Sequence, residues 1–258
     1  MSAYGISASG IRMQQYILDT IAHNMANMHT TGFKARRAEP ADIRFDLHDI
    51  LELQSGEDEP ASAGVYFQAT TTLWGQGAAQ ITDRDLDVAI FGEGFLRIDT
   101  GAGIAYTRNG ALNIDANGTL VTDGGGYVLD VDGQPIQIPA AMTFARIDRA
   151  GNVFAVPVAG GAEQQVGQIS LARFDSPDGL LAIGDSLFQE TEASGAPVIG
   201  VSGAEGFGRV INGVLEMANL DLADEMTRMV EAQRAYQLNI NALRTLDEMI
   251  ARAFDMRR

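Results

Sequence analysis

Apolar side chains recur every seven residues at both ends of the chain. Two interleaved sets with this spacing place a stripe along one face of a helix. The sequence therefore predicts an N-terminal amphipathic helix, and Gly32 is expected to end it. The N-terminal sets are Tyr4, Ile11, Leu18 and Met25, and Ser7, Gln14, Ile21 and Met28.

The C-terminal repeat is longer and contains neither glycine nor proline from residue 214 onward. Sustained heptads of this kind are typical of a helix that supercoils with a partner. We expect a helix from Asp221 to Met256, about 54 Å long, with Asn219 or Asp221 as its N-cap. The two sets are Leu222, Met229, Tyr236, Leu243 and Ile250, and Met226, Gln233, Ile240, Asp247 and Phe254.

Two amphipathic helices packed on one compact domain would also produce such stripes. Here the repeats lie at opposite ends of the chain, flank a different kind of sequence, and include polar residues such as Gln14, Gln233 and Asp247. Both interpretations stay open on the pattern alone. If the heptad surfaces are unpaired, the ends pair with each other, with neighbouring subunits, or with both.

The middle of the chain, from about residue 65 to 212, consists of short apolar runs separated by turn residues. Asn117–Gly118, Asp132–Gly133 and Gly151–Asn152 are typical turn sequences. This pattern predicts an antiparallel sheet or sandwich. The predicted strands cover residues 94–99, 119–122, 127–131, 136–138, 152–156 and 168–174.

These patterns predict an α+β fold, with long N- and C-terminal helices pairing as a coiled coil and a central, mainly antiparallel β domain. Residues 1–48 hold the first helix and the turn after it. Residues 49–64, charged and rich in small side chains, are expected to form a flexible loop. The β domain then spans 65–212, and the heptad helix 213–258.

Charge is distributed unevenly along the chain. The 18 basic and 34 acidic residues give a formal net charge of −16. Residues 1–48 carry +1 and residues 219–258 carry −1, so residues 49–218 account for the whole −16. This acid excess argues against a nucleic-acid-binding protein, because phosphates attract basic surfaces.

Several classes of protein are disfavoured by what the sequence lacks. With 0 cysteines the chain has no disulfide, thiol nucleophile or cysteine-ligated metal. No apolar run approaches the roughly 20 residues that span a bilayer. The first residues have neither the basic segment nor the continuous apolar segment of a secretory signal peptide, which by itself indicates a cytoplasmic protein.

The sequence offers little catalytic chemistry. His23, His29 and His48 are not spaced to share a helix face for a metal. The aspartates of residues 83–87 lack the glycine and glutamate of a calcium loop, and residues 101–106 do not form a dinucleotide-binding motif. We therefore expect neither enzyme activity nor a cofactor or metal, although carboxylate pairs for glycoside hydrolysis stay open because they assemble from distant positions.

Motifs along nearly the whole chain resemble those of bacterial flagellar rod and hook proteins. Near the N-terminus these are Asn24-Met-Ala-Asn27 and Thr31-Gly-Phe-Lys34; His23 and Met25 depart from the usual asparagine and leucine. The C-terminal and central motifs are Gly213–Glu216, Asn219–Asp221, Gln233–Tyr236 with Asn239, Thr245 and Asp247–Met249, and Leu86–Ile90, Gly92–Phe95 and Tyr106–Gly110. Chain length, residues 192–197 and Gln233–Tyr236 are most similar to distal-rod members, with a proximal-rod paralogue as the alternative.

This resemblance implies a structural subunit of the flagellar basal-body rod that polymerises into a hollow helical drive shaft transmitting torque to the hook. It implies pairing of the terminal helices and export, unfolded, by the flagellar type III system without a cleaved signal peptide. The implied partners are other copies, other rod proteins, the hook protein, the export apparatus and the surrounding outer rings. Nucleic-acid binding and membrane insertion are not expected.

The residues expected to make subunit contacts lie in the two heptad segments and in the turn after the first. A rival interpretation is a secreted adhesin or carbohydrate-binding module with helical flanks. The expected contact residues are Ile11, Leu18, Ile21, Asn24, Met25, Asn27, Met28, Thr31, Gly32, Phe33, Leu222, Met226, Met229, Gln233, Arg234, Tyr236, Ile240, Leu243 and Ile250.

Overall fold

The structure is a computed structural model that describes residues 3–45 and 61–255. The chain divides into two compact units. Unit 1 comprises residues 1–26, 36–73 and 221–258, and unit 2 comprises residues 27–35 and 74–220. Both terminal helices belong to unit 1, whereas unit 2 is mainly antiparallel β structure, so the predicted α+β class is confirmed.

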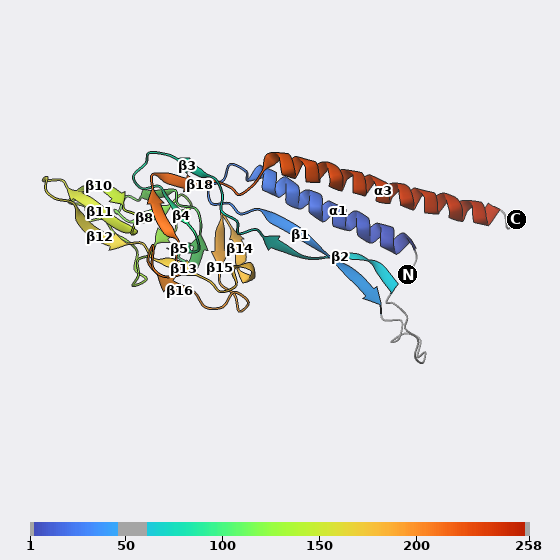
Figure 1. The fold of residues 1–258 in the computed structure, drawn as a ribbon, viewed down its shortest axis with the longest axis horizontal. Coiled ribbons are helices and arrows are strands. Elements are labelled where there is room, and N and C mark those ends of the chain that lie inside the picture. Colours follow the sequence, from blue (N-terminus) through green and yellow to red (C-terminus); the bar gives the residue numbers. More distant parts are fainter. Residues whose placement is uncertain (1–2, 46–60, 256–258) are drawn as a thin grey trace. The chain divides into compact units, whose positions relative to one another are not determined.

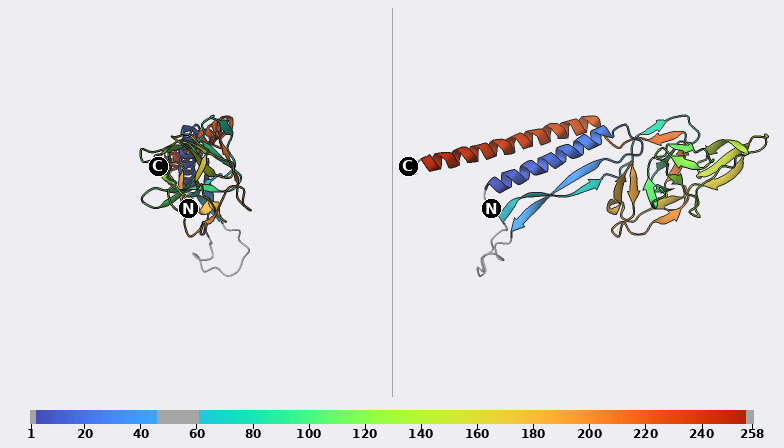
Figure 2. Two further views of the ribbon diagram at one scale, coloured as in Figure 1. Left: turned by 90° about the vertical axis from the view of Figure 1, so that its left-hand side faces the viewer. Right: turned by 180° about the vertical axis from the view of Figure 1, so that it is seen from behind.

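Unit 1 contains two helices and a hairpin. Helix α1 (Ala3–Ala26) lies between helix α3 (Leu222–Asp255) and the hairpin of strands β1 (Arg36–Phe45) and β2 (Ala61–Thr72) (Figures 1 and 2). The predicted C-terminal helix is confirmed, and Asp221 is its N-cap because its Oδ1 accepts the backbone N–H of Ala223 at 2.8 Å.

The first helix ends earlier than expected. Helix α1 stops at Ala26, so the expectation that Gly32 ends it is wrong. Residues 27–33 form successive turns instead, in which the N–H of Thr30 bonds to the carbonyl of Asn27 and that of Phe33 to the carbonyl of Thr30. Gly32 has another role, described below.

The β1–β2 hairpin was not predicted from the sequence. Its strands are antiparallel, with irregular register at Glu39–Pro40, and Pro40 together with the many charged residues hides the alternation that marks a strand. Strand β2 begins at Ala61, inside the range expected to be a loop; residues 46–60 of that range lie outside the described residues. The ring of Tyr16 on α1 stacks on Phe67 of β2 at 4.7 Å.

All strand pairs of unit 2 are antiparallel. One large sheet follows the order β14-β15-β6-β5-β9-β8-β7, with β13 pairing with β5 and β16; β10-β11-β12 form a separate sheet, and β17-β4 and β18-β3 are pairs. The strands are β3 (Ala79–Ile81), β4 (Val88–Phe91), β5 (Phe95–Asp99), β6 (Ile104–Thr107), β7 (Leu112–Ile114), β8 (Leu120–Thr122), β9 (Tyr127–Val128), β10 (Met142–Ile147), β11 (Asn152–Pro157), β12 (Gln164–Gln168), β13 (Leu171–Arg173), β14 (Leu181–Gly184), β15 (Leu187–Gln189), β16 (Val198–Gly200), β17 (Arg209–Asn212) and β18 (Val214–Glu216).

Three of the strand predictions differ from the structure. Of the predicted strand 127–131 only Tyr127–Val128 form a strand, β9, and Leu129 and Asp130 make isolated bridges. Residues 136–138 form only an isolated bridge, at Gln137 opposite Thr119, and the predicted strand 168–174 divides between the last residue of β12 and β13. The three predicted turns are confirmed, and they share one geometry. In Asp115–Thr119, Asp130–Gln134 and Asp148–Asn152 the aspartate Oδ1 accepts the backbone N–H four residues later, at 2.7–2.8 Å, and the fourth residue is a glycine with positive φ.

The apolar core of unit 2 is divided into clusters. Its main cluster includes Leu96, Leu112, Ile147 and Ile169, all at most 1% exposed. A second, aromatic cluster forms around Phe95, where Tyr106, Phe174 and Phe188 are buried and Trp74 packs against them. No helix in the described part of the chain is long and apolar enough to cross a bilayer.

Candidate functional site

Two arrangements bring together residues that the sequence singled out: the helix pair of unit 1 and a buried polar cluster in unit 2. The helices α1 and α3 run antiparallel. Asn24 lies opposite Glu225, with Nδ2 3.5 Å from Oε2, and Gly10 lies against Asn239, whose Nδ2 is 3.0 Å from where a Cβ would be. This alignment puts Ala3 level with Leu246, so α3 continues nine residues further, to Asp255 (Figure 1).

The helices meet along a heptad seam that only half matches the predicted one. Met229, Tyr236 and Leu243, one predicted set, are half-buried. The second set was expected at Met226 and Gln233, but these are exposed; the less exposed positions are one residue earlier, at Glu225, Ala232 and Asn239. At these positions the seam therefore uses Glu225, Ala232 and Asn239 in place of the predicted Met226, Gln233 and Ile240.

Asn24 is the polar centre of this seam, with only 1% of its surface exposed. Its Oδ1 accepts the backbone N–H of Arg36 at 2.9 Å, and its Nδ2 donates to the Arg36 carbonyl at 2.8 Å. Nδ2 also faces Glu225 on α3, so the Asn24 side chain joins α1, β1 and α3. Glu225 Oε1 in turn lies 3.4 Å from Arg228 Nη1. Buried polar groups of this kind fix helix register.

The other predicted residues of the helices are divided between the seam and the surface. On α1, Ile21 is buried, whereas Ile11, Leu18 and Met25 are half-buried, as is Met28 just after the helix. On α3, Ile240 is half-buried and Gln233 and Arg234 are exposed. Leu222, Met226 and Val230, spaced four residues apart, are 42%, 53% and 45% exposed, so they form an apolar stripe on the surface of unit 1. Ile250 is exposed because it lies beyond the start of α1.

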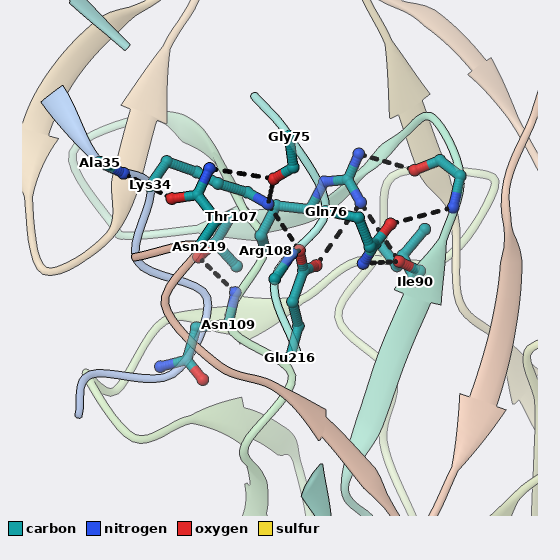
Figure 3. A network of polar contacts seen from close by, with 12 residues as sticks. Lys34, Ala35, Gly75, Gln76, Ile90, Thr107, Arg108, Asn109, Glu216 and Asn219 are labelled. Carbon is teal, nitrogen blue, oxygen red and sulfur yellow. Dashed lines mark hydrogen bonds and ion pairs between the residues drawn. The ribbon is translucent and has the colours of Figure 1, made fainter. Parts of the chain in front are cut away.

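The second arrangement is a buried ionic cluster centred on Glu216 (Figure 3). Glu216 Oε1 accepts from Lys34 Nζ at 2.5 Å and from the backbone N–H of Gly77 at 2.8 Å. Arg108 Nη1 lies 3.6 Å from Glu216 Oε2. All three charged side chains are at most 8% exposed, and Lys34 also donates to the Gly75 carbonyl at 2.8 Å.

Backbone and amide hydrogen bonds extend this cluster. The N–H of Gly32 donates to the Glu216 carbonyl at 2.7 Å, and the N–H of Ala35 donates to Asn219 Oδ1 at 2.7 Å. Asn219 Nδ2 in turn donates to the Gly75 carbonyl at 3.0 Å (Figure 3). The segment that follows α1 in the sequence is thus bonded directly to the segment that precedes α3.

Gly32 is required here by close packing and not by a helix end. Its φ is +66°, and a Cβ at this position would clash with the backbone of Asn109. Beside it, Thr31 Oγ1 and Asn109 Oδ1 are 2.8 Å apart, and Phe33 is buried. Asn27 accepts at Oδ1 from the hydroxyl of Thr30 at 3.3 Å. The predicted residues 27–33 therefore shape the polar cluster of unit 2.

Burial governs the electrostatics of the cluster. It lowers the pKa of the Lys34 ammonium, and the hydrogen bond to Glu216 opposes that shift. Burial also lowers the pKa of the Arg108 guanidinium, against the attraction of Glu216. Among the described residues, no group of three or more histidines and carboxylates could hold a metal ion. The cluster holds residues 31–35, 75–77, 108 and 216–219 of unit 2 together through ion pairs and hydrogen bonds.

Lys34, Arg108 and Glu216 were not among the residues predicted to form the site, although each lies in a motif that carries the family resemblance. Each is a single charged residue within a motif of mostly glycine and apolar residues. Such a charge is costly to bury without a partner, and this could have indicated that each has one. Their pairing could not be read from the sequence because they are separated by 74 and 108 positions.

Two family models and several full-length proteins match this chain, and all of them are flagellar. The family model described as the flagellar hook protein FlgE/F/G D1 domain matches residues 89–155, and that described as the flagellar basal body rod FlgEFG protein C-terminal matches residues 211–256. The flagellar basal-body rod protein FlgG of Borreliella burgdorferi is 40% identical over 100% of this chain and 99% of its own length. The proteins of the same name from Caulobacter vibrioides and Bacillus subtilis are 36% and 38% identical, covering 100% and 97% of both chains.

Proposed function

The chain belongs to the FlgG family of flagellar basal-body rod proteins, structural subunits of the rod, and we propose that it polymerises through its terminal helices into the helical shaft. In this proposal α1 and α3 pair as a coiled coil within each subunit, and their remaining surfaces pack against neighbouring copies. Contacts between unlike surfaces, repeated without closing a ring, generate a helical filament.

The observation that carries this proposal is the apolar surface that unit 1 leaves uncovered. Leu222, Met226 and Val230 form one stripe, and the last nine residues of α3 extend past the start of α1 with Met249 and Ile250 exposed. Such patches are typical of interaction sites. A groove of about 440 Å³ beside the seam, lined by Ile17, Ala232 and Arg228 among others, offers a further contact surface.

The remaining parts of the proposal follow from family membership. We propose that the partners are other rod proteins and the hook protein, that the chain occupies the distal rod within the outer rings, and that it reaches the rod unfolded through the flagellar export apparatus. The residues expected to make subunit contacts are those of the two heptad segments. No catalytic activity is proposed, since the family is one of structural proteins.

The test is polymerisation of the purified chain, measured by sedimentation and electron microscopy. Met226→Asp places a charge in the exposed stripe and should abolish filaments while leaving the monomer folded. Thr227→Asp adds the same charge one position along, at another exposed residue outside the stripe, and should polymerise as the wild type does. Filaments from the Met226→Asp chain at the wild-type concentration would contradict the proposal.

A further inference from the structure

The large sheet of unit 2 ends in strands that have a partner on one side only. Followed through β13, the strand order is β14-β15-β6-β5-β13-β16, and among the described residues β14 pairs only with β15 and β16 only with β13. The outer backbone groups of such edge strands can bond to a further strand. The sheet also ends at β7, but there Arg84 Nη2 lies across the edge and donates to Asn113 Oδ1 at 2.8 Å and to the Leu112 carbonyl at 3.5 Å.

The two open strands, β14 and β16, are apolar and uncharged. In β14, Leu181 and Ile183 are 55% and 47% exposed, and in β16, Val198 and Ile199 are each 44% exposed. Neither strand contains proline or a charged residue, with which edge strands usually prevent pairing. Edges of this kind are typical of sites where another strand adds to a sheet.

Strand direction makes these two edges suited to each other. Every pair along the path from β14 to β16 is antiparallel, so the strands alternate in direction and β14 runs opposite to β16. A second copy placed in line with the sheet therefore brings its β16 alongside β14 in antiparallel orientation, which continues the alternation. The two strands have 4 and 3 residues, so their lengths are closely matched.

We propose that β14 of one copy pairs with β16 of a second copy, so that the sheet continues from subunit to subunit. Unit 2 contains 18 acidic and 8 basic residues, so identical units repel over most of their surfaces. Residues 179–184 and 193–204, which include the two strands, contain no charged side chain, and there two copies can approach closely. Because the edges are unlike, each copy can pair at both, and the contact extends along a filament. This proposal rests on polymerisation of the chain.

The experiment introduces thiols into a chain that has 0 cysteines, so that every cross-link comes from an introduced residue. Leu181→Cys in one full chain and Val198→Cys in another are mixed in equal amounts, brought above the polymerisation threshold, and treated with a short bis-maleimide. The pairing register puts both residues on the same face of the sheet, and Leu181 precedes the irregular register between Ala182 and Gly184. A denaturing gel measures cross-linked dimers, and sedimentation of the same samples measures filaments.

The matched control mixes Leu181→Cys with Val131→Cys. Val131 is 44% exposed, like Val198, but lies outside both strands, in the Asp130–Gln134 turn. We expect about tenfold more cross-linked dimer from Leu181→Cys with Val198→Cys than from the control, because strand pairing holds the two thiols at a high effective concentration.

The outcomes separate this proposal from the previous one. Filaments with equal dimer yields in the two mixtures would overturn the strand pairing and leave polymerisation intact. An equally high yield from Leu181→Cys alone would show that like edges pair, and would also overturn it. Absence of filaments at every concentration would overturn the proposed function; equal yields in those samples would overturn the strand pairing as well, whereas the expected excess would support it as a contact between two copies.

Discussion

The two units differ in what they bury. Unit 2 has a buried core of large aliphatic side chains, and even the charges of Lys34, Arg108 and Glu216 are buried as a closed cluster, although apolar residues at its edges are exposed. In unit 1 the helix seam combines apolar residues such as Ile21 with small or polar residues such as Asn24 and Ala232, and several large apolar residues of α3 remain outside it. Those exposed on α3 are Leu222, Met226, Val230, Leu238, Met249 and Ile250.

This difference indicates that the two units have separate roles in stability and assembly. A unit with a large buried core is stabilised mainly by its own packing, whereas a helix pair with an exposed apolar stripe gains further free energy when another surface covers it. Stability of unit 2 and assembly through unit 1 can therefore be altered separately, and substitutions in the two units should have different consequences.

The largest effect is expected for Glu216→Ala in unit 2. Removing this carboxylate leaves Lys34 and Arg108 buried without their counter-charge, which should lower the free energy of unfolding by about 3–5 kcal/mol. Chemical denaturation followed by Trp74 fluorescence measures it. Glu205→Ala removes an exposed carboxylate of the same unit and should change stability by less than about 0.5 kcal/mol; equal effects of the two substitutions would show that the cluster does not hold unit 2 together.

The next largest effect tests the seam against the exposed stripe within unit 1. Ile21 is 4% exposed, so Ile21→Ala should lower the free energy of unfolding by about 2–4 kcal/mol. Met226→Ala, at an exposed apolar position, should change it by less than about 0.5 kcal/mol while weakening polymerisation. Far-UV circular dichroism during denaturation, below the polymerisation threshold, gives the comparison. A destabilisation by Met226→Ala as large as that by Ile21→Ala would place Met226 in the seam.

The sequence predicted the two long helices and the β unit because periodicity and turn residues act locally. The heptads located α3 almost to the residue, and Asp-x-x-Gly turns were recognisable because only glycine adopts their positive φ without strain. The β1–β2 hairpin was missed because Pro40 and the charges around it obscure its alternation. Helix α1 was expected to run on to Gly32 because a glycine packed against Asn109 looks, in the sequence, like a helix end.

On α3, one of the two predicted sets of seam positions lies one residue too late in the sequence, and this has a physical reason. An apolar moment locates the most hydrophobic face, and on α3 part of that face, at Leu222 and Met226, is left exposed. The face that packs on α1 is marked by Ala232 and Asn239, which allow the helices to approach closely but carry little hydrophobic signal. The Glu216 cluster depends on long-range pairing, which no local pattern encodes.

A smaller effect should follow from Asn24→Ala, which tests whether the polar centre of the seam stabilises unit 1. The substitution removes both hydrogen bonds to Arg36 and leaves Glu225 without the asparagine amide, so we expect a loss of about 1–3 kcal/mol. Gln15→Ala, at an exposed position of α1, is the control. Circular dichroism during denaturation measures both, and a loss no greater than that of the control would mean that register is set by the apolar residues alone.

The smallest effect concerns pH and the enclosed core of unit 2. Burial, reinforced by Glu190, raises the pKa of the Tyr106 phenol to about 12, and the hydroxyl donates to Glu190 at 3.1 Å. Between pH 10 and 12 the unfolded chain therefore loses this proton before the folded chain does. The contribution is fully present below pH 10 and is lost as the pH rises through 12.

Tyr106→Phe isolates this contribution. The free energy of unfolding of the wild type should fall between pH 9 and pH 11 by about 1 kcal/mol more than that of Tyr106→Phe, since one pKa unit corresponds to about 1.4 kcal/mol. Trp74 fluorescence during denaturation at each pH measures the difference. Parallel pH profiles would mean that solvent reaches the phenol in the folded chain, and that the aromatic cluster around Phe95 is less well buried than the structure shows.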